Sequence, residues 1–224
     1  GPLYQAAYML GGLQLRALHG EVCGPGKMSE REKQMLVSEV NILRELHHPN
    51  IVRYYDRIID RDFSKIFIVM EYCEGGDIAT MIKNSRKEKN QLPEDMIWAI
   101  LSQVAQALQN CHTRKEGKIL HRDLKPGNIF LDSNYNVKLG DFGLSRVMGD
   151  QSVFAYTHVG TPYYMSPEQI QDQKYNEKSD IWALGCIIYE VAALRAPFEA
   201  TTHLQLATKI KAGKLDRIPR CYSD

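Results

Sequence analysis

The chain has 224 residues, of which 44% are hydrophobic and 25% charged, and its formal net charge is +1 at pH 7. This length fits one large domain or two small ones, and the composition is typical of a soluble globular protein. A nearly neutral chain gives no indication of a nucleic-acid or acidic-membrane partner, and its apolar runs are too short to cross a bilayer. The five cysteines lack paired spacing, which indicates reduced thiols and a cytoplasmic or nuclear location.

The N-terminal part of the chain divides into a segment without a clear pattern and a predicted helix. Residues 1–25 are interrupted by glycines and show no clean period, so we leave them unassigned. Ser29 and Glu32 form a capping-box pattern, and apolar residues then recur at helical spacing. Pro49 restricts the residue before it and cannot extend the helix, so we expect the helix to end just before this proline.

The remaining chain has strand patterns first and helix patterns later. Residues 51–60 and 65–72 are rich in β-branched and aromatic residues and predict a hairpin. A Gly-Gly pair at 75–76 predicts a hinge, Pro93 opens a long helix, and residues 181–194 predict a buried helix. This order predicts an α+β, two-lobed fold, with a small lobe to about residue 72 and a large lobe from about residue 74.

Four motifs in the second half of the chain carry the chemistry. They are His-Arg-Asp-Leu-Lys-Pro-Gly-Asn at 121–128, Asp-Phe-Gly at 141–143, Ser-Pro-Glu at 166–168 and Asp-Ile-Trp-Ala-Leu-Gly at 180–185. An isolated Asp or Asn in a loop is usually a turn former, so only the joint spacing favours a functional interpretation. In this order and spacing the motifs resemble the catalytic loop, the metal-binding loop and the central large-lobe helix of eukaryotic protein kinases.

The resemblance implies transfer of the ATP γ-phosphate to protein serine or threonine hydroxyls. This reaction needs two oxygens held in line and the charge on the transferring group neutralised. Asp123 matches the carboxylate that accepts the hydroxyl proton, and Lys125 matches the lysine that reaches the γ-phosphate and marks serine/threonine kinases. Asn128 and Asp141 match the oxygen ligands of Mg²⁺.

The resemblance also implies a nucleotide-binding hinge. In the run Met-Glu-Tyr-Cys at 70–73, the backbone groups of Glu71 and Cys73 match those that hydrogen-bond the adenine, and Met70 matches the gatekeeper. Glu39, in the predicted first helix, matches the glutamate that pairs with the ATP-positioning lysine. His121 is expected to pack structurally and not to act as a base.

Four further positions match regulatory residues of the family. Arg122 matches the arginine that pairs with a phosphorylated activation loop, and Phe142 lies within the metal-binding motif. Thr157 matches an activating autophosphorylation position, and Thr161 matches a threonine near the substrate hydroxyl.

Residues 26–224 are identified as a partial protein kinase domain similar to the NimA-related kinases, and to their centrosomal and mitotic branch in particular. The stretches that carry this likeness lie at 32–40, 48–56, 70–77 and 160–168. The resemblance implies protein substrates, a cell-cycle role, a location at the centrosome, cytoskeleton or nucleus, and a homodimer formed through segments outside this chain.

The N-terminal segment departs from the kinase pattern. A G-x-G-x-x-G loop and a strand lysine partner for Glu39 are not visible, and counting back without gaps places Glu21 at the lysine position. We therefore expect a kinase domain truncated at both ends, with its small-lobe sheet reduced to a hairpin. The alternative is a catalytically inactive fragment or pseudokinase that acts as a binding module.

Overall fold

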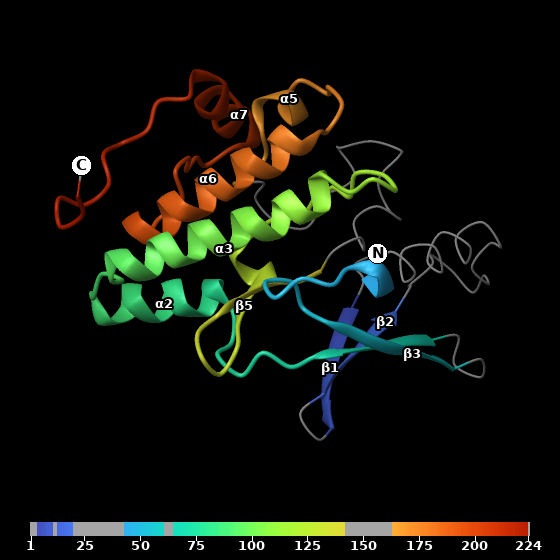
Figure 1. Cartoon of the computed structure of the whole chain (residues 1–224). Helices are drawn as coiled ribbons and strands as arrows, with labels where there is room; N and C mark the ends of the chain where they lie inside the picture. Colours follow the sequence, from blue (N-terminus) through green and yellow to red (C-terminus); the bar gives the residue numbers. More distant parts are fainter. Residues whose placement is uncertain (1–3, 11–12, 20–42, 61–64, 142–162, 224) are drawn as a thin grey trace.

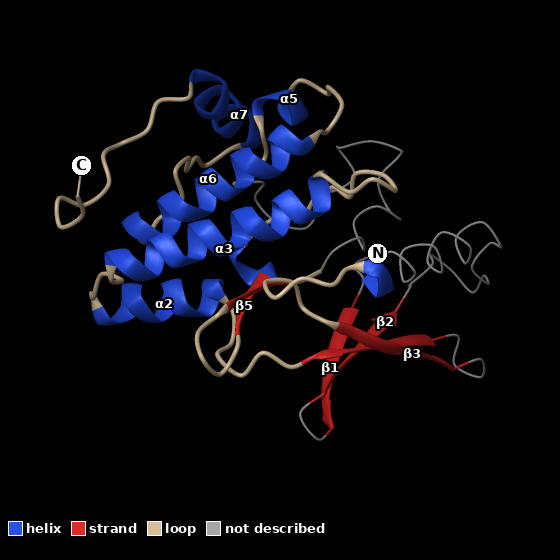
Figure 2. Cartoon of the chain, viewed as in Figure 1, coloured by secondary structure: helices blue, strands red, loops and turns tan. Residues whose placement is uncertain are grey.

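The computed structural model describes residues 4–10, 13–19, 43–60, 65–141 and 163–223. A small sheet and a larger helical part lie at opposite ends of the molecule (Figures 1 and 2). The strands of the small lobe precede the helices of the large lobe along the chain, and the α+β, two-lobed prediction is confirmed. Within the described residues, no helix is long and apolar enough to cross a membrane.

The small-lobe sheet contains the predicted hairpin. Strands β3 (Tyr54–Asp60) and β4 (Lys65–Glu71) pair antiparallel, which confirms the prediction for residues 51–72. Ile68 and Met70 are buried on one face of β4, where they pack against Leu43 and Val52. One face of the hairpin is therefore apolar and buried, which agrees with the alternation of buried and partly exposed residues along β4.

The same sheet contains two further strands that the sequence analysis did not predict. Strands β1 (Tyr4–Leu10) and β2 (Leu13–His19) pair with each other, and β2 also pairs with β4. The sheet therefore has four strands in the order β1-β2-β4-β3, and the expectation that it is reduced to a hairpin is wrong. The physical reason is that β4 has a second edge of backbone N–H and C=O groups, and β2 satisfies it.

Three long helices form most of the large lobe. They are α2 (Ile78–Glu88), α3 (Glu94–His112) and α6 (Glu177–Ala193), and the short helices α5 (Pro167–Ile170) and α7 (His203–Ala212) lie beyond α6 (Figure 1). Asp77 caps α2 by accepting the Thr80 backbone N–H, and Asn176 caps α6 in the same way. The predicted helices after Pro93 and over residues 181–194 are both confirmed.

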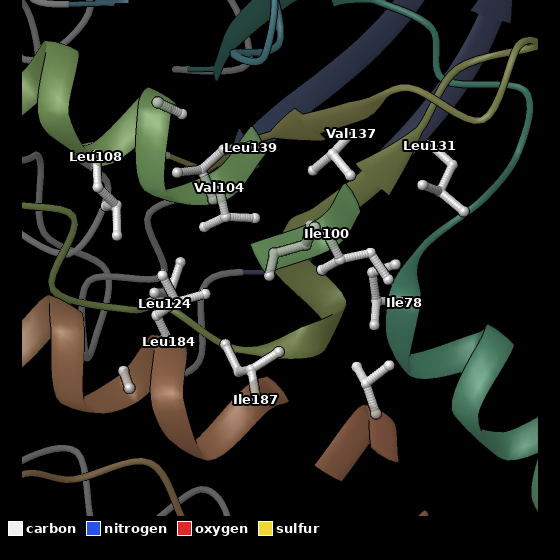
Figure 3. Close-up of a cluster of buried hydrophobic side chains, with 14 of the residues drawn as sticks. Ile78, Ile100, Val104, Leu108, Leu124, Leu131, Val137, Leu139, Leu184 and Ile187 are labelled. Carbon is white, nitrogen blue, oxygen red and sulfur yellow. The ribbon is translucent and has the colours of Figure 1, made fainter. Parts of the chain in front are cut away.

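The core of the large lobe lies between α3, α6 and a two-stranded sheet. A short 3₁₀ helix, η1 (Pro126–Asn128), leads into β5 (Ile129–Leu131), which pairs with β6 (Val137–Leu139). Figure 3 shows apolar side chains from these elements converging on one another: Ile78, Ile100, Val104, Leu108, Leu124, Leu131, Val137, Leu139, Leu184 and Ile187. Because these side chains are buried together, the catalytic loop is held in place between the helices and the two-stranded sheet.

The first predicted helix lies mostly outside the described residues. Residues 43–45 are helical, and the chain leaves the helix before Pro49, as expected. The Ser29 start of that helix, Glu21 and Glu39 all fall in residues 20–42, which the structure does not describe.

Candidate active site

The loop at 121–128 brings together the two predicted catalytic side chains and one predicted metal ligand. The Lys125 Nζ lies 2.6 Å from Oδ2 of Asp123, and both side chains are 45% exposed. The Asn128 Nδ2 donates to the backbone O of Asp123 at 2.7 Å and to its Oδ2 at 3.0 Å. These bonds fix the direction of the Asp123 carboxylate while leaving it accessible to an incoming hydroxyl group.

Asn128 connects this loop to the end of β6. Its side chain is buried, and its backbone O accepts the N–H of Gly140 at 2.9 Å. The Nε2 of His121 lies 2.9 Å from the backbone O of Gly140, which can only accept, so this ring nitrogen donates. Asp141 follows Gly140 directly and has a positive φ of 57°, which turns the chain sharply at this residue. The two predicted metal ligands therefore stand on segments that are hydrogen-bonded to each other.

The donor set fits a magnesium ion that is shared with phosphate groups. Within the part of the chain that the structure describes, no group of three or more His, Cys, Asp or Glu side chains could hold a metal by itself. Mg²⁺ usually takes only one or two carboxylates and completes its shell with water and phosphate oxygens. Since the Asn128 amide nitrogen is engaged by Asp123, its amide oxygen remains to join Asp141 as a ligand.

Asp180 is fully buried, and its carboxylate is hydrogen-bonded to the backbone of the catalytic loop. The Asp180 carboxylate accepts the backbone N–H groups of His121 (3.0 Å) and Arg122 (3.1 Å), and also the Tyr175 hydroxyl. It accepts from the His112 Nε2 at 2.7 Å as well. Arg122 has a positive φ of 67°, an unusual conformation that these bonds stabilise.

The pKa of Asp180 lies below the ordinary aspartate value. Burial by itself would raise this pKa, but the hydrogen bonds from His112, Tyr175 and the His121 backbone, with the nearby His121 ring, outweigh it. The sequence analysis used Asp180 only as part of a motif and missed its structural role. The helix dipole already favours an aspartate in the first turn of a helix, so its position there is only a weak signal for this role.

The predicted hinge follows β4 as expected. Met70 and Cys73 are buried, and the Gly76 backbone N–H donates to the Cys73 O. A Cβ atom on Gly75 would lie 2.7 Å from the Leu131 Cβ, so only glycine allows the hinge to approach β5 this closely. The Met70 side chain packs against Ile68 on the buried face of the sheet.

The remaining predicted positions are only partly described. Phe142, Thr157 and Thr161 fall in residues 142–162, outside the described residues, as does Glu39. Strand β2 contains no lysine, and its Arg16 stands in register with Ile68 of β4.

Glu168, in the Ser-Pro-Glu motif, accepts the hydroxyl of Ser179 at 2.6 Å. Burial alone would raise the Glu168 pKa, but the Ser179 bond and other hydrogen bonds lower it.

A groove lies beside the catalytic loop. Its volume is about 320 Å³, and it lies between α2 and α6 next to Lys125. The lining mixes apolar side chains, such as Ile82, with charged ones, such as Lys83 and Glu190.

Comparison with known families agrees with this geometry. The model of the protein kinase domain matches residues 25–221. The chain belongs to the protein kinase family. The match begins after β1 and β2, so the first two strands of the sheet precede the part of this kinase domain that resembles other kinases.

Its relatives include NimA-related kinases. The chain is 59% identical to human "Serine/threonine-protein kinase Nek2" over 201 residues, which are 89% of the chain and 45% of that protein. It is 56% identical to the "Probable serine/threonine-protein kinase nek2" of Dictyostelium discoideum over 204 residues, 91% of the chain and 48% of that protein. It is 46% identical to the "G2-specific protein kinase nimA" of Emericella nidulans, over 88% of the chain and 32% of that protein. This kinase domain thus spans less than half the length of these relatives.

Proposed function

We propose that this kinase domain transfers the γ-phosphate of Mg-ATP to serine or threonine hydroxyl groups of proteins. The observation that carries the proposal is the joined arrangement of Asp123, Lys125 and Asn128 around one carboxylate, next to the segment that carries Asp141. The names of the relatives, which include serine/threonine-protein kinases, support the same reaction.

Each side chain has a role that follows from its position. Asp123 orients the substrate hydroxyl and takes its proton while the hydroxyl oxygen forms a bond to the γ-phosphorus. The bond between that phosphorus and the ADP oxygen breaks, and ADP leaves. Lys125 places positive charge beside the transferring group, and Asn128 and Asp141 would hold Mg²⁺. When bound, Mg²⁺ neutralises charge on the phosphate oxygens.

The nucleotide and the substrate enter from different sides in this proposal. The backbone of Glu71 and Cys73 binds adenine, with Met70 as gatekeeper at the back. A protein substrate lies along the groove next to Lys125, since that groove reaches the catalytic loop. Glu39 and Phe142 belong to the active arrangement, and Thr161 lies near the substrate hydroxyl.

Regulation and context are also proposals. Phosphorylation of Thr157 orders the activation loop by pairing with Arg122, because a phosphate favours an arginine partner. The similarity to kinases whose names include Nek2 and nimA supports a cell-cycle role in the cytoplasm, centrosome or nucleus. Dimerisation would use segments outside this chain.

The test is single-turnover transfer of labelled γ-phosphate to a generic serine/threonine protein substrate. Asp123→Asn should slow transfer by roughly 10²–10⁴-fold, since a positioned general base contributes about that much. Asp172→Asn, an exposed aspartate outside the site, serves as the matched control and should leave the rate unchanged. Failure of the parent chain to transfer phosphate would contradict the proposal and favour a binding module.

A further inference from the structure

An ion pair joins the hinge to the strand that leads into the metal-binding loop. The Glu71 Oε1 at the end of β4 lies 2.7 Å from the Lys138 Nζ in β6, and the two side chains are only 22% and 15% exposed. These strands belong to different sheets, one in the small lobe and one in the large lobe. The pair therefore crosses between the two lobes.

The second oxygen of the same carboxylate makes another bond. The Glu71 Oε2 accepts the backbone N–H of Arg53 at 3.1 Å, and the Glu71 backbone N–H donates to the Arg53 O at 2.8 Å. The segment that contains Arg53 is bonded to β6 in turn, through Val52 N–H to Leu139 O (2.9 Å) and Leu139 N–H to Asn50 O (2.8 Å). Each of three segments, residues 50–53, the hinge and β6, thus contacts the other two. The Glu71 side chain contacts both residues 50–53 and β6.

Lys138 occupies a position in β6 that the core does not use. Its neighbours Val137 and Leu139 are buried, and alternation along the strand directs Lys138 to the other face. The proposed metal ligand Asp141 lies three residues after Lys138 on the same segment of chain. The sequence analysis used only the backbone of Glu71 and assigned Lys138 no role.

We propose that the Glu71–Lys138 ion pair is a positioning device that sets the hinge backbone relative to the strand carrying Asp141. Neither side chain touches the nucleotide in this proposal, and both act through the backbone that they hold. A charge-assisted hydrogen bond between partly buried groups is stronger than one in open solvent. Removing one partner leaves the other charge partly desolvated and frees the two lobes to turn relative to each other. The nucleotide readout below rests on the proposed function, and the exchange readout does not.

The first test measures hydrogen exchange of backbone amides in the whole chain without nucleotide. Lys138→Met removes the charge and keeps an apolar stem, whereas Lys138→Arg keeps a cation and is the matched control. The amides of Val52, Glu71 and Leu139 should exchange about three- to tenfold faster in the Met variant and near the parent rate in the Arg variant. Unchanged exchange in the Met variant would overturn the proposal.

A double-mutant cycle guards against a general loss of stability. Glu71→Gln keeps an oxygen for the Arg53 N–H but loses the charge, so it should accelerate the same amides to a similar extent. Because both substitutions break one pair, the double variant should exchange no faster than either single variant. Additive acceleration would show that the two residues act independently, against the proposal.

The second test measures the dissociation constant of a fluorescent ATP analogue with Mg²⁺. It should rise about three- to tenfold in Lys138→Met and stay near the parent value in Lys138→Arg. Faster exchange with an unchanged dissociation constant would overturn the positioning role and leave a purely structural ion pair. If the parent chain binds no nucleotide, the proposed function fails. The exchange experiment still tests whether the ion pair holds the hinge against β6.

Discussion

The catalytic loop of the large lobe and the sheet of the small lobe are stabilised by different kinds of hydrogen bond. Around the catalytic loop, side-chain hydrogen bonds define each position, and the Asp180 carboxylate alone accepts two backbone N–H groups, a tyrosine hydroxyl and a histidine ring. In the small lobe, β2 joins the sheet through backbone pairing with β4, and β1 joins it through pairing with β2. A polar network requires particular residue types, whereas a sheet edge accepts many sequences.

The family match begins at residue 25, whereas the sheet begins at residue 4, so β1 and β2 both lie outside the matched region. The large lobe keeps the residue types that its chemistry and its buried network need. The small lobe is completed by strands that lie outside the matched region, because pairing with β4 needs only an extended segment of suitable length. The large lobe should therefore be sensitive to the loss of single polar side chains, and the small lobe to the loss of backbone hydrogen bonds.

The largest effect is expected from removing the buried acceptor of the catalytic loop. Asp180→Ala leaves the donors of His112, Tyr175 and the loop backbone without a partner, and should cost about 3–5 kcal/mol of unfolding free energy. Asp95→Ala removes an exposed aspartate from the first turn of α3 and should cost no more than about 1 kcal/mol. Urea unfolding measures both, and similar costs for the two would contradict the account of the network.

The next effect tests the backbone pairing of β2. Strand β2 lies between β1 and β4, so the backbone N–H of Ala17 donates to one of these two strands. Ala17→Pro removes this donor and should lower the unfolding free energy by about 2–4 kcal/mol. Ala17→Val keeps the donor and favours a strand, so its unfolding midpoint in urea should stay near that of the parent. A harmless proline would show that β2 does not belong to the sheet.

A smaller effect is expected where β6 meets β5. A Cβ on Gly140 would lie 2.7 Å from the Phe130 ring and 3.2 Å from the Val52 side chain, so Gly140→Ala should cost about 1–3 kcal/mol. Gly127→Ala meets nothing within 4 Å and is the control. Thermal unfolding measures the melting temperatures of both variants. A lower melting temperature for Gly127→Ala than for Gly140→Ala would contradict the prediction.

The smallest effect concerns acid stability. The pKa of Asp180 is lower in the folded chain than in the unfolded chain, so its contribution to stability is fully present above the ordinary aspartate range. That contribution is lost as the pH falls from the unfolded pKa through the lowered folded pKa. Asp180→Asn should therefore make the unfolding free energy less dependent on pH below about 4. An equally steep acid loss in this variant would assign the dependence to other carboxyl groups.

Much of the large lobe could be predicted because its signals are local. Pro93 opens α3, and the spacing of Asp123, Asn128 and Asp141 identified the residues that the fold brings together. Strands β1 and β2 were missed because their alanines weaken the strand pattern. A signal was present, since Gly11-Gly12 separates two seven-residue stretches and the second begins with apolar and polar residues in alternation, Leu-Gln-Leu-Arg. The Glu71–Lys138 pair could not be predicted, because it depends on how two distant sheets meet.

Magnesium-dependent nucleotide binding tests the central claim most directly, that the large lobe of this chain retains a working metal and nucleotide site. Calorimetric titration of the whole chain with ATP, with and without Mg²⁺, should show tighter binding with the metal. Asp141→Asn should remove most of that gain, and Asp172→Asn should retain it. Binding that is indifferent to Mg²⁺ and to Asp141→Asn, or no binding at all, would contradict the claim.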